Sequence, residues 1–287
     1  MTYRVVVGVD GSPASAAALS WATEEAGLRG AELVAWTVLD RPESRLAADT
    51  VGGQTSRPSS GESAGGYPVA IRQSHGDAGA ELVAACADAD ADLFVVGSRG
   101  RGPLAGLVLG SVSRTCLAHA PCPVVVVRPQ PEQPPSHRRV IVGVDGSGHA
   151  RQALRVAAEE AGLRDAPLAV VHAVYWDNIG TELLTPTVEQ LVEWGHKLVA
   201  VELAATGVTG TPVVEHGHAT EVLVRHSADA DLLVLGSRGH NPVAGLLLGS
   251  TSEHCARYAH CPVMVTHATG KRPAAGRAQA FMQGEVK

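Results

Sequence analysis

Apolar and polar positions alternate along the chain in two regular ways, as short β-branched runs and as longer alanine-rich stretches. The run at residues 4–9 is followed by Ser12, a good N-cap, and by Pro13, which suits the first helical position. The helix predicted from Pro13 ends near residues 27–30, and a second strand follows at 32–39. Strands that alternate with helices in this way are typical of an α/β fold with a parallel sheet.

The same alternation continues to the end of each half of the chain. The later strands are predicted at about 69–72, 93–96 and 124–127 in the first half, and at about 213–215, 232–235 and 263–266 in the second. The fourth strand of each half is continuously apolar, as expected for a strand buried on both faces of a parallel sheet. Each half therefore predicts a doubly wound, five-stranded parallel sheet of about 130 residues, the size of one ordinary domain.

The two halves are copies of one another. Residues 6–12, Val-Val-Gly-Val-Asp-Gly-Ser, return at 141–147 with one conservative change, at an offset of 135 residues (145 − 10). Residues 24–29 return unchanged at 159–164, with the same offset. Later motifs recur at an offset of 139 residues (236 − 97), so the second copy has about four additional residues in its middle. The match is too long to arise by chance, and it predicts a tandem repeat of one domain.

Proline marks the boundary between the two copies. Residues 129–139 hold four prolines among polar residues, which is typical of a stiff, extended linker. The last twenty residues show no apolar period. We therefore predict a first domain at 1–128, a linker at 129–139, a second domain at 140–267 and a disordered tail at 268–287.

One segment differs between the copies. Residues 41–66 are rich in glycine, serine and proline, whereas residues 187–205 of the second copy carry apolar residues at helical spacing. We expect a mobile loop in the first copy where the second has a helix.

Composition excludes several classes of function. The formal net charge is −6 and the pI is about 6.1, so the chain has no basic surface that would favour DNA or RNA as a partner. The sequence shows no signal peptide and no apolar run of membrane-spanning length, which predicts a cytoplasmic protein. Five cysteines are scattered through apolar stretches, as expected of reduced core residues.

The strongest chemical signal is a glycine motif that occurs once in each copy. Gly97-x-x-Gly100 is followed by nine residues and then by Gly110-Ser111, and the second copy has Gly236-x-x-Gly239, nine residues and Gly249-Ser250. Glycines after a strand bring backbone N–H groups close to an anion, because no Cβ is in the way. The Gly-Ser pair then opens a short helix whose free N–H groups and positive dipole end face the same anion. The motif predicts a phosphate-binding site in each copy.

This motif differs from the two best-known nucleotide loops. The sequence has no GxxxxGK[ST], and its three lysines, Lys197, Lys271 and Lys287, lie outside both loops. It also has no GxGxxG after the first strand. A loop without lysine lacks the point charge that phosphoryl transfer uses, which favours nucleotide binding over catalysis.

Asp10 and Asp145 follow the first strand of each copy, at the sheet edge where α/β folds bind ligands. These carboxylates could hold a ribose hydroxyl or a metal ion on the phosphates. A lone Asp-Gly-Ser is also explained as a strand-to-helix turn with serine as the N-cap. The histidines beside Cys255 and Cys261 suggest metal ligands, but Thr115 and Pro121 replace them in the first copy, and we predict no metal centre made by the protein alone.

On these residues the chain resembles the universal stress protein family, in its ATP-binding branch with tandem domains, over nearly all of residues 1–267. The resemblance implies the strand order 3-2-1-4-5, which makes the first and fourth strands neighbours. It implies that adenosine is contacted by Gly8, Asp10 and Val38 in the first copy, and by Gly143, Asp145 and Ala173 in the second. It implies that phosphates are surrounded by Gly97, Gly100, Gly110, Ser111, Val112 and Ser113, and by Gly236, Gly239, Gly249, Ser250, Thr251 and Ser252. We add the residues that follow the glycines as candidate ligand contacts: Ser98, Arg99, Arg101, Ser237 and Arg238.

The resemblance implies a cytoplasmic regulator in stress response that binds one ATP per domain, with Mg²⁺ as a candidate companion ion, and that forms a homodimer. Two alternatives remain open. The chain could be a slow ATPase that uses Asp10 or Asp145 to place a metal ion, or an interaction module that no longer binds nucleotide.

Overall fold

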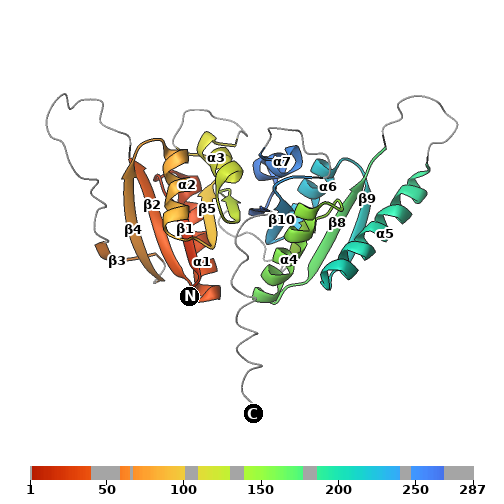
Figure 1. The fold of residues 1–287 in the computed structure, drawn as a ribbon, viewed down its shortest axis with the longest axis horizontal. Coiled ribbons are helices and arrows are strands. Elements are labelled where there is room, and N and C mark those ends of the chain that lie inside the picture. Colours follow the sequence, from red (N-terminus) through yellow and green to blue (C-terminus); the bar gives the residue numbers. More distant parts are fainter. Residues whose placement is uncertain are drawn as a thin grey trace, which may run out of the picture. The chain divides into compact units, whose positions relative to one another are not determined.

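The computed structural model describes residues 2–39, 59–64, 67–100, 109–129, 139–176, 186–239 and 247–267 (Figure 1). The chain divides into two compact units, Met1–Gln130 and Pro131–Gly270. Most of the predicted linker and the whole predicted tail lie outside the described residues. Each unit is an α/β sandwich with one predominantly parallel sheet.

The first unit has the doubly wound topology that the pattern predicts. Its strands are β1 (Arg4–Gly8), β2 (Glu32–Leu39), β3 (Ser59–Ala64), β4 (Tyr67–His75), β5 (Leu93–Gly97) and β6 (Val124–Val127), and its helices are α1 (Pro13–Arg29), α2 (Ala78–Asp88) and α3 (Ser111–His119). The sheet order is β3-β4-β2-β1-β5-β6, and all pairs except β3 with β4 are parallel. Without β3, this is the predicted order 3-2-1-4-5.

The second unit repeats this topology. Its strands are β7 (Val140–Gly143), β8 (Leu168–Val174), β9 (Thr211–His216), β10 (Leu232–Gly236) and β11 (Val263–Thr266), and its helices are α4 (Gly148–Leu163), α5 (Val188–Thr206), α6 (Ala219–His226), the 3-10 turn η1 (Ser227–Asp229) and α7 (Ser250–Tyr258). The order is β9-β8-β7-β10-β11, all parallel. The predicted fold class is confirmed in both units.

The prediction of a loop at residues 41–66 is wrong where the structure describes that segment. Residues 59–64 form β3, which pairs antiparallel with β4 and has a register shift between Ser60 and Glu62. Backbone ladder bonds depend little on side chains, so a strand can form in a segment whose composition is typical of a turn. Residues 40–58 lie outside the described part of the chain.

Local sequence signals explain where the helices begin. The Ser12 hydroxyl accepts a hydrogen bond from the Ser15 N–H at 3.2 Å, and Pro13 occupies the first turn of α1. Ser147 caps α4 in the same way, accepting from the Ala150 N–H at 3.1 Å. Thr187 and Gln190 form a reciprocal capping box at the start of α5. These caps fix the loops that follow β1 and β7, at the carboxyl edge of each sheet.

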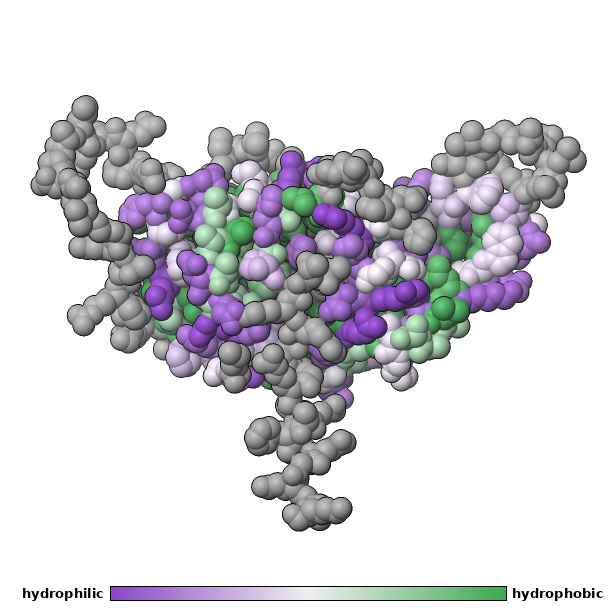
Figure 2. Space-filling model, in the orientation of Figure 1, coloured by the Kyte–Doolittle hydropathy of each residue, from purple (hydrophilic) through white to green (hydrophobic). Residues whose placement is uncertain are grey.

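The surface of the described residues mixes hydrophilic and hydrophobic side chains. In Figure 2 purple and green residues are interspersed over the described part of the visible face. Within the described ranges, no helix has both the length and the apolar character that crossing a bilayer requires.

Candidate functional site

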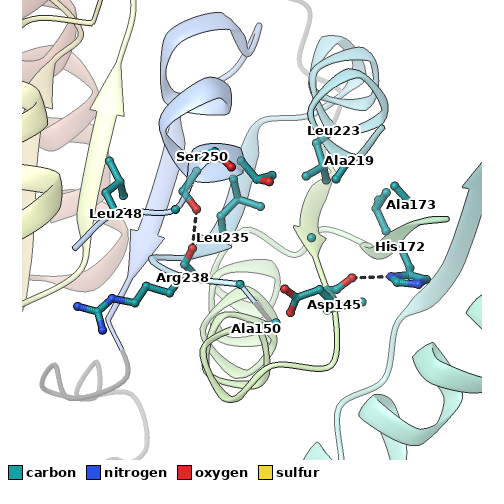
Figure 3. Close-up of a pocket in the computed structure, with 18 residues that line it drawn as sticks. Asp145, Ala150, His172, Ala173, Ala219, Leu223, Leu235, Arg238, Leu248 and Ser250 are labelled. Atoms are coloured by element: carbon teal, nitrogen blue, oxygen red, sulfur yellow. Dashed lines mark hydrogen bonds between the residues drawn. The ribbon is translucent and has the colours of Figure 1, made fainter. Parts of the chain in front are cut away.

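The second unit has a cavity at the carboxyl ends of β7 and β10. These strands are neighbours whose following helices pack on opposite faces, which is the topological switch point of a doubly wound sheet. The cavity has a volume of about 430 Å³, within the usual range for a small-molecule site. Figure 3 shows Asp145, Ala173, Leu223 and Ser250 placed around it from different elements.

One end of this cavity is formed by the N-terminus of α7. Gly249 is the N-cap residue, and its N–H donates to the Ser237 carbonyl at 2.7 Å. The first helical bond runs from the Glu253 N–H to the Gly249 carbonyl at 3.0 Å. The N–H groups of residues 250–252 therefore come before the helical ladder, and no side chain of the described residues caps this helix. Three amides and a positive dipole end together favour an anion here.

The first unit builds the same arrangement. The Gly110 N–H donates to the Ser98 carbonyl at 2.9 Å, and the Arg114 N–H donates to the Gly110 carbonyl at 3.0 Å. No described side chain caps α3. Identical backbone geometry in the two copies means that the glycine motif, rather than local packing, determines the loop.

Close packing within the protein explains why some positions of the motif are glycine, but not others. A Cβ at Gly97 would lie 2.6 Å from the Ala14 carbonyl carbon, and one at Gly236 would lie 2.8 Å from the His149 backbone and Cβ. These two glycines allow the first helix of each unit to pack against the strand end. Their role is explained within the protein, without a ligand.

Gly110 and Gly249 have no comparable reason. A Cβ at Gly110 would meet its nearest atoms at 3.5 Å, and one at Gly249 would lie 3.3 Å from the Ser237 carbonyl oxygen, so at most a small adjustment is needed. Their φ values of −62° and −74° suit any residue. Glycine at these positions is best explained by close approach of an outside group to the backbone.

Asp145 forms part of the opposite wall. Its Oδ1 accepts a hydrogen bond from the Ser147 N–H at 3.0 Å, and the Asp10 Oδ1 accepts from the Ser12 N–H at 2.9 Å in the first unit. This turn holds the second carboxylate oxygen towards the glycine loop. The turn explanation and the ligand explanation are thus compatible, since one oxygen serves the turn and the other faces the loop.

The serines of the motif divide into two kinds. The buried Ser252 hydroxyl donates to the Gly236 carbonyl at 2.6 Å, and Ser113 donates to the Gly97 carbonyl at 2.7 Å. Their single O–H donor is therefore used to tie the helix to the strand end. Ser111 and Ser250 are exposed, each as the first residue of its helix.

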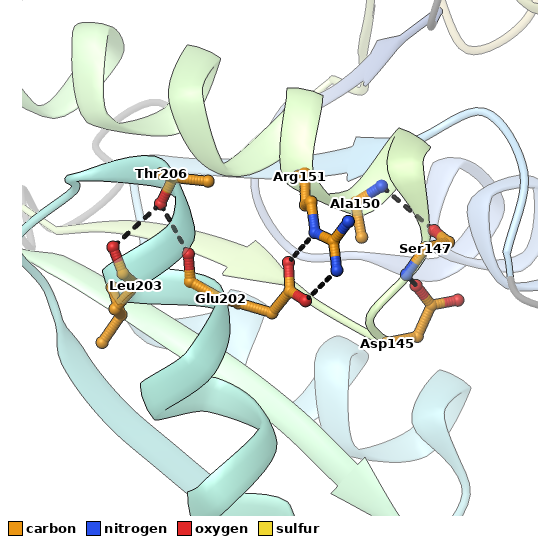
Figure 4. A network of polar contacts seen from close by, with 7 residues as sticks. All are labelled: Asp145, Ser147, Ala150, Arg151, Glu202, Leu203 and Thr206. Carbon is orange, nitrogen blue, oxygen red and sulfur yellow. Dashed lines mark hydrogen bonds and ion pairs between the residues drawn. The ribbon is translucent and has the colours of Figure 1, made fainter.

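A polar network fixes α4 and α5 beside the cavity. The Arg151 guanidinium donates to both carboxylate oxygens of Glu202, at 2.8 and 2.9 Å, and the Thr206 hydroxyl donates to the Glu202 carbonyl at 2.7 Å (Figure 4). The Glu202 side chain is 3% exposed and the Arg151 side chain is 43% exposed, so the ion pair joins the two helices at the protein surface. Because Ala150, the neighbour of Arg151, lines the cavity, this contact helps to fix the cavity wall.

Positive charge lies near both loops. Burial and then repulsion from Arg99 lower the pKa of Arg128, and burial and then Arg238 lower the pKa of His149, against a smaller opposing effect of Asp145. In Figure 3 the Arg238 side chain extends away from Asp145. Of these groups Arg99 and Arg238 line the two spaces, where their charge would attract an anion.

The structure brings most of the predicted residues together. The second cavity is lined by Gly143, Asp145, Ala173, Gly236, Arg238, Gly239, Gly249, Ser250, Thr251 and Ser252 among those predicted. The corresponding hollow of the first unit is lined by Gly8, Asp10, Val38, Gly97, Arg99, Gly100, Val112 and Ser113. Ser98 and Ser237 are buried beside the loops and line neither space, and Gly110 and Ser111 lie outside the lining of the first hollow. Arg101 lies outside the described residues.

Sequence reasoning missed the apolar walls. In the second unit Val171, Ala219 and Leu223 line the cavity, and in the first unit Trp36, Ala78 and Leu82 take those places. Strand alternation could have found Trp36, two residues before Val38 on the same face, and helical spacing could have found the pairs on α2 and α6. Across the described part of the chain, no three His, Cys, Asp or Glu side chains are close enough to hold a metal ion.

The fold and site define a class of protein, a tandem doubly wound α/β protein with a glycine motif and a free helix N-terminus at the switch point of each unit. Residues 1–128 and 136–267 both match the universal stress protein family, and the chain belongs to that family. Universal stress protein Rv2623 of Mycobacterium tuberculosis is 32% identical over 290 residues, covering 91% of this chain and 95% of that protein. A universal stress protein of Mycolicibacterium smegmatis is 33% identical over 285 residues, covering 92% and 96%. The crystal structure of a universal stress protein from Archaeoglobus fulgidus shares the fold, with a TM-score of 0.63 and 20% identity over 92% of this chain and 96% of that one.

Proposed function

We propose that this universal stress protein binds ATP and acts as a nucleotide-dependent regulator in stress response. The observation that carries the proposal is the N-terminus of α7, whose first amides face a cavity of about 430 Å³ and whose N-cap glycine is not required by close packing among the described residues. A helix N-terminus of this kind supports a phosphate group.

The remaining walls fit the rest of an adenine nucleotide. Val171, Ala173 and Leu223 offer an apolar surface to a base, and the Asp145 carboxylate is placed to accept a hydrogen bond from a ribose hydroxyl. Among the described lining residues Asp145 is also the one carboxylate that could contact Mg²⁺ carried by the phosphates.

The site supports binding better than hydrolysis. Among the described residues, no lysine lines either space. No described lining His or Glu lies beside the α7 amides, where it could act as a general base. The regulator would therefore act by changing conformation or partner affinity when nucleotide binds. A homodimer remains a prediction, which sedimentation over a wide concentration range would test.

Calorimetric titration with ATP, with and without Mg²⁺, tests this function directly. Gly249→Ala places a methyl group among the α7 amides and should weaken ATP binding at least tenfold. The same change should lower the free energy of unfolding by about 1 kcal/mol, because alanine is a poorer N-cap than glycine. Gly162→Ala is the matched control, because a Cβ there meets nothing within 4 Å. A flat titration of the folded wild-type protein, or equal affinity of both variants, would contradict the proposal.

A further inference from the structure

We propose that the two nucleotide sites are unequal, and that Trp36 makes them so. The second unit takes a complete adenine nucleotide, whereas the Trp36 indole fills the base position of the first unit and excludes the adenosine part. This inference rests on the proposed function and departs from the expectation of one nucleotide per domain.

Strand register places Trp36 and Val171 at the same position of the fold. Gly8 pairs with Trp36 across β1 and β2, and Gly143 pairs with Val171 across β7 and β8. The backbone bond that follows is also repeated, since the Val9 N–H donates to the Trp36 carbonyl at 2.8 Å and the Val144 N–H donates to the Val171 carbonyl at 2.9 Å. Both side chains line the space beside the motif loop of their own unit. An indole therefore stands where the other copy has an isopropyl group.

The space beside Trp36 is smaller than the space beside Val171, as expected if the larger side chain fills it. The second unit's cavity measures about 430 Å³, and the equivalent hollow of the first unit measures about 90 Å³. Small-molecule sites usually begin at about 300 Å³, so the first hollow is too small for a nucleoside. Two other wall positions also carry larger residues in the first unit, Val38 for Ala173 and Ser15 for Ala150, but each adds far less volume than an indole.

The indole is held in place by the neighbouring strand. Trp36 Nε1 donates to the Ser74 hydroxyl at 3.1 Å. Ser74 pairs with Val38 across β2 and β4, so this bond anchors the ring against β4. In the second unit Glu215 takes the place of Ser74, since it pairs with Ala173, and it contacts Arg225 and His226 on α6. That carboxylate is thus held by α6 and does not anchor a side chain of β8 as Ser74 anchors Trp36.

The described parts of the glycine motif are alike in the two units, which makes Trp36 the deciding residue. Both loops keep the same N-cap glycine, the same first helical bond and the same Asp-Gly approach. Exchanging the wall residue should therefore move nucleotide occupancy without rebuilding the anion site.

The test counts adenine nucleotide per chain, by denaturing mass spectrometry after saturation with ATP and removal of free ligand. We expect one nucleotide in the wild-type protein, two in Trp36→Val and none in Val171→Trp. Trp194→Ala, which removes an exposed tryptophan outside both spaces, should still bind one. Because Val171 is buried, Gly249→Ala serves if Val171→Trp does not fold. At an ATP concentration below the wild-type dissociation constant, where occupancy is proportional to affinity, it should lower occupancy of the single site at least tenfold.

The outcomes separate this inference from the function on which it rests. Two nucleotides in the wild-type protein, or an occupancy at ATP below the dissociation constant that Gly249→Ala leaves unchanged, would overturn the inequality and leave ATP binding in place. One nucleotide in Trp36→Val would show that the indole is not what closes the first site. No nucleotide in wild-type protein would overturn the proposed function itself.

Discussion

Gly239 lies directly against the carboxylate of Asp145, so closely that a Cβ on the glycine would stand 2.8 Å from Asp145 Oδ2. Gly100 and Asp10 repeat the relationship in the first unit, at 2.6 Å. Because the φ of neither glycine is positive, the requirement for glycine here is one of space. The glycine loop and the aspartate turn, which lie far apart in the sequence, therefore form one unit of the site.

Gly239→Ala should displace the Asp145 carboxylate and weaken ATP binding by about 1–3 kcal/mol, the usual cost of forcing an extra methyl group into a packed site. That corresponds to roughly 5- to 150-fold in the dissociation constant. Calorimetry on Gly239→Ala, Asp145→Ala and the double variant forms a cycle. The losses should be less than additive, because both changes disturb the same carboxylate, and additive losses would show that loop and aspartate act separately.

Removing the Ser252 hydroxyl should mainly lower stability, whereas removing the Ser250 hydroxyl should mainly weaken ATP binding. Ser252→Ala leaves the half-buried Gly236 carbonyl without its 2.6 Å donor and should lower the free energy of unfolding by about 1–3 kcal/mol. Ser250→Ala should change stability by less than about 0.5 kcal/mol, since the side chain is exposed, but should weaken ATP binding. Urea denaturation and calorimetry measure the two effects. A stable Ser252→Ala that loses ATP would mean that this hydroxyl contacts the ligand instead.

The fold was largely predictable because its signals are periodic and were present twice. Ser12-Pro13, the Ala-rich helices and the apolar runs specify element type, and the order of strands came from the family resemblance. β3 escaped prediction, because its Ser-Ser-Gly-Glu-Ser-Ala sequence has no apolar alternation and its ladder bonds are made by the backbone.

The candidate site was predictable in its loops and not in its walls. Glycine spacing pointed to both candidate sites, yet it could not show that Gly97 serves helix packing, whereas Gly110 has no such contact among the described residues. The difference between Trp36 and Val171 was present in the sequence at an offset of 135 residues (171 − 36). The consequence of this difference for the sites could be seen only from the strand register, which places both side chains beside the glycine motif of their own unit.

The cysteine thiols should be unreactive in the folded protein. All five are buried, and burial raises the pKa of Cys116, Cys255 and Cys261 to about 12. Since the thiolate is the reactive form, labelling with a disulfide reagent at pH 8 should be slow in native protein and reach five thiols per chain in denaturant. Rapid labelling of one or more thiols under native conditions would show that the core opens locally.

Stability should fall as the solution becomes mildly acidic, and His149 should account for part of the loss. Its pKa lies below the usual 6.5 because burial disfavours the imidazolium and Arg238 repels it, with Asp145 opposing weakly. Below pH 6.5 the unfolded chain therefore takes up a proton that the folded protein does not, so the free energy of unfolding decreases until the pH reaches the folded pKa. Above pH 6.5 the imidazole of residue 149 is neutral in both the folded and the unfolded state, so it no longer makes stability depend on pH.

His149→Ala isolates this contribution, because the first copy has alanine at the equivalent position, Ala14. Urea midpoints at pH 7.5 and 5.5 should differ more in the wild-type protein than in the variant, while the other twelve histidines (13 − 1) are common to both. A steeper decline in His149→Ala would mean that the imidazolium is stabilised in the folded state, and that Asp145 outweighs burial and Arg238. The sign of the difference therefore reports which charge dominates at the start of α4, where a phosphate would bind beside it.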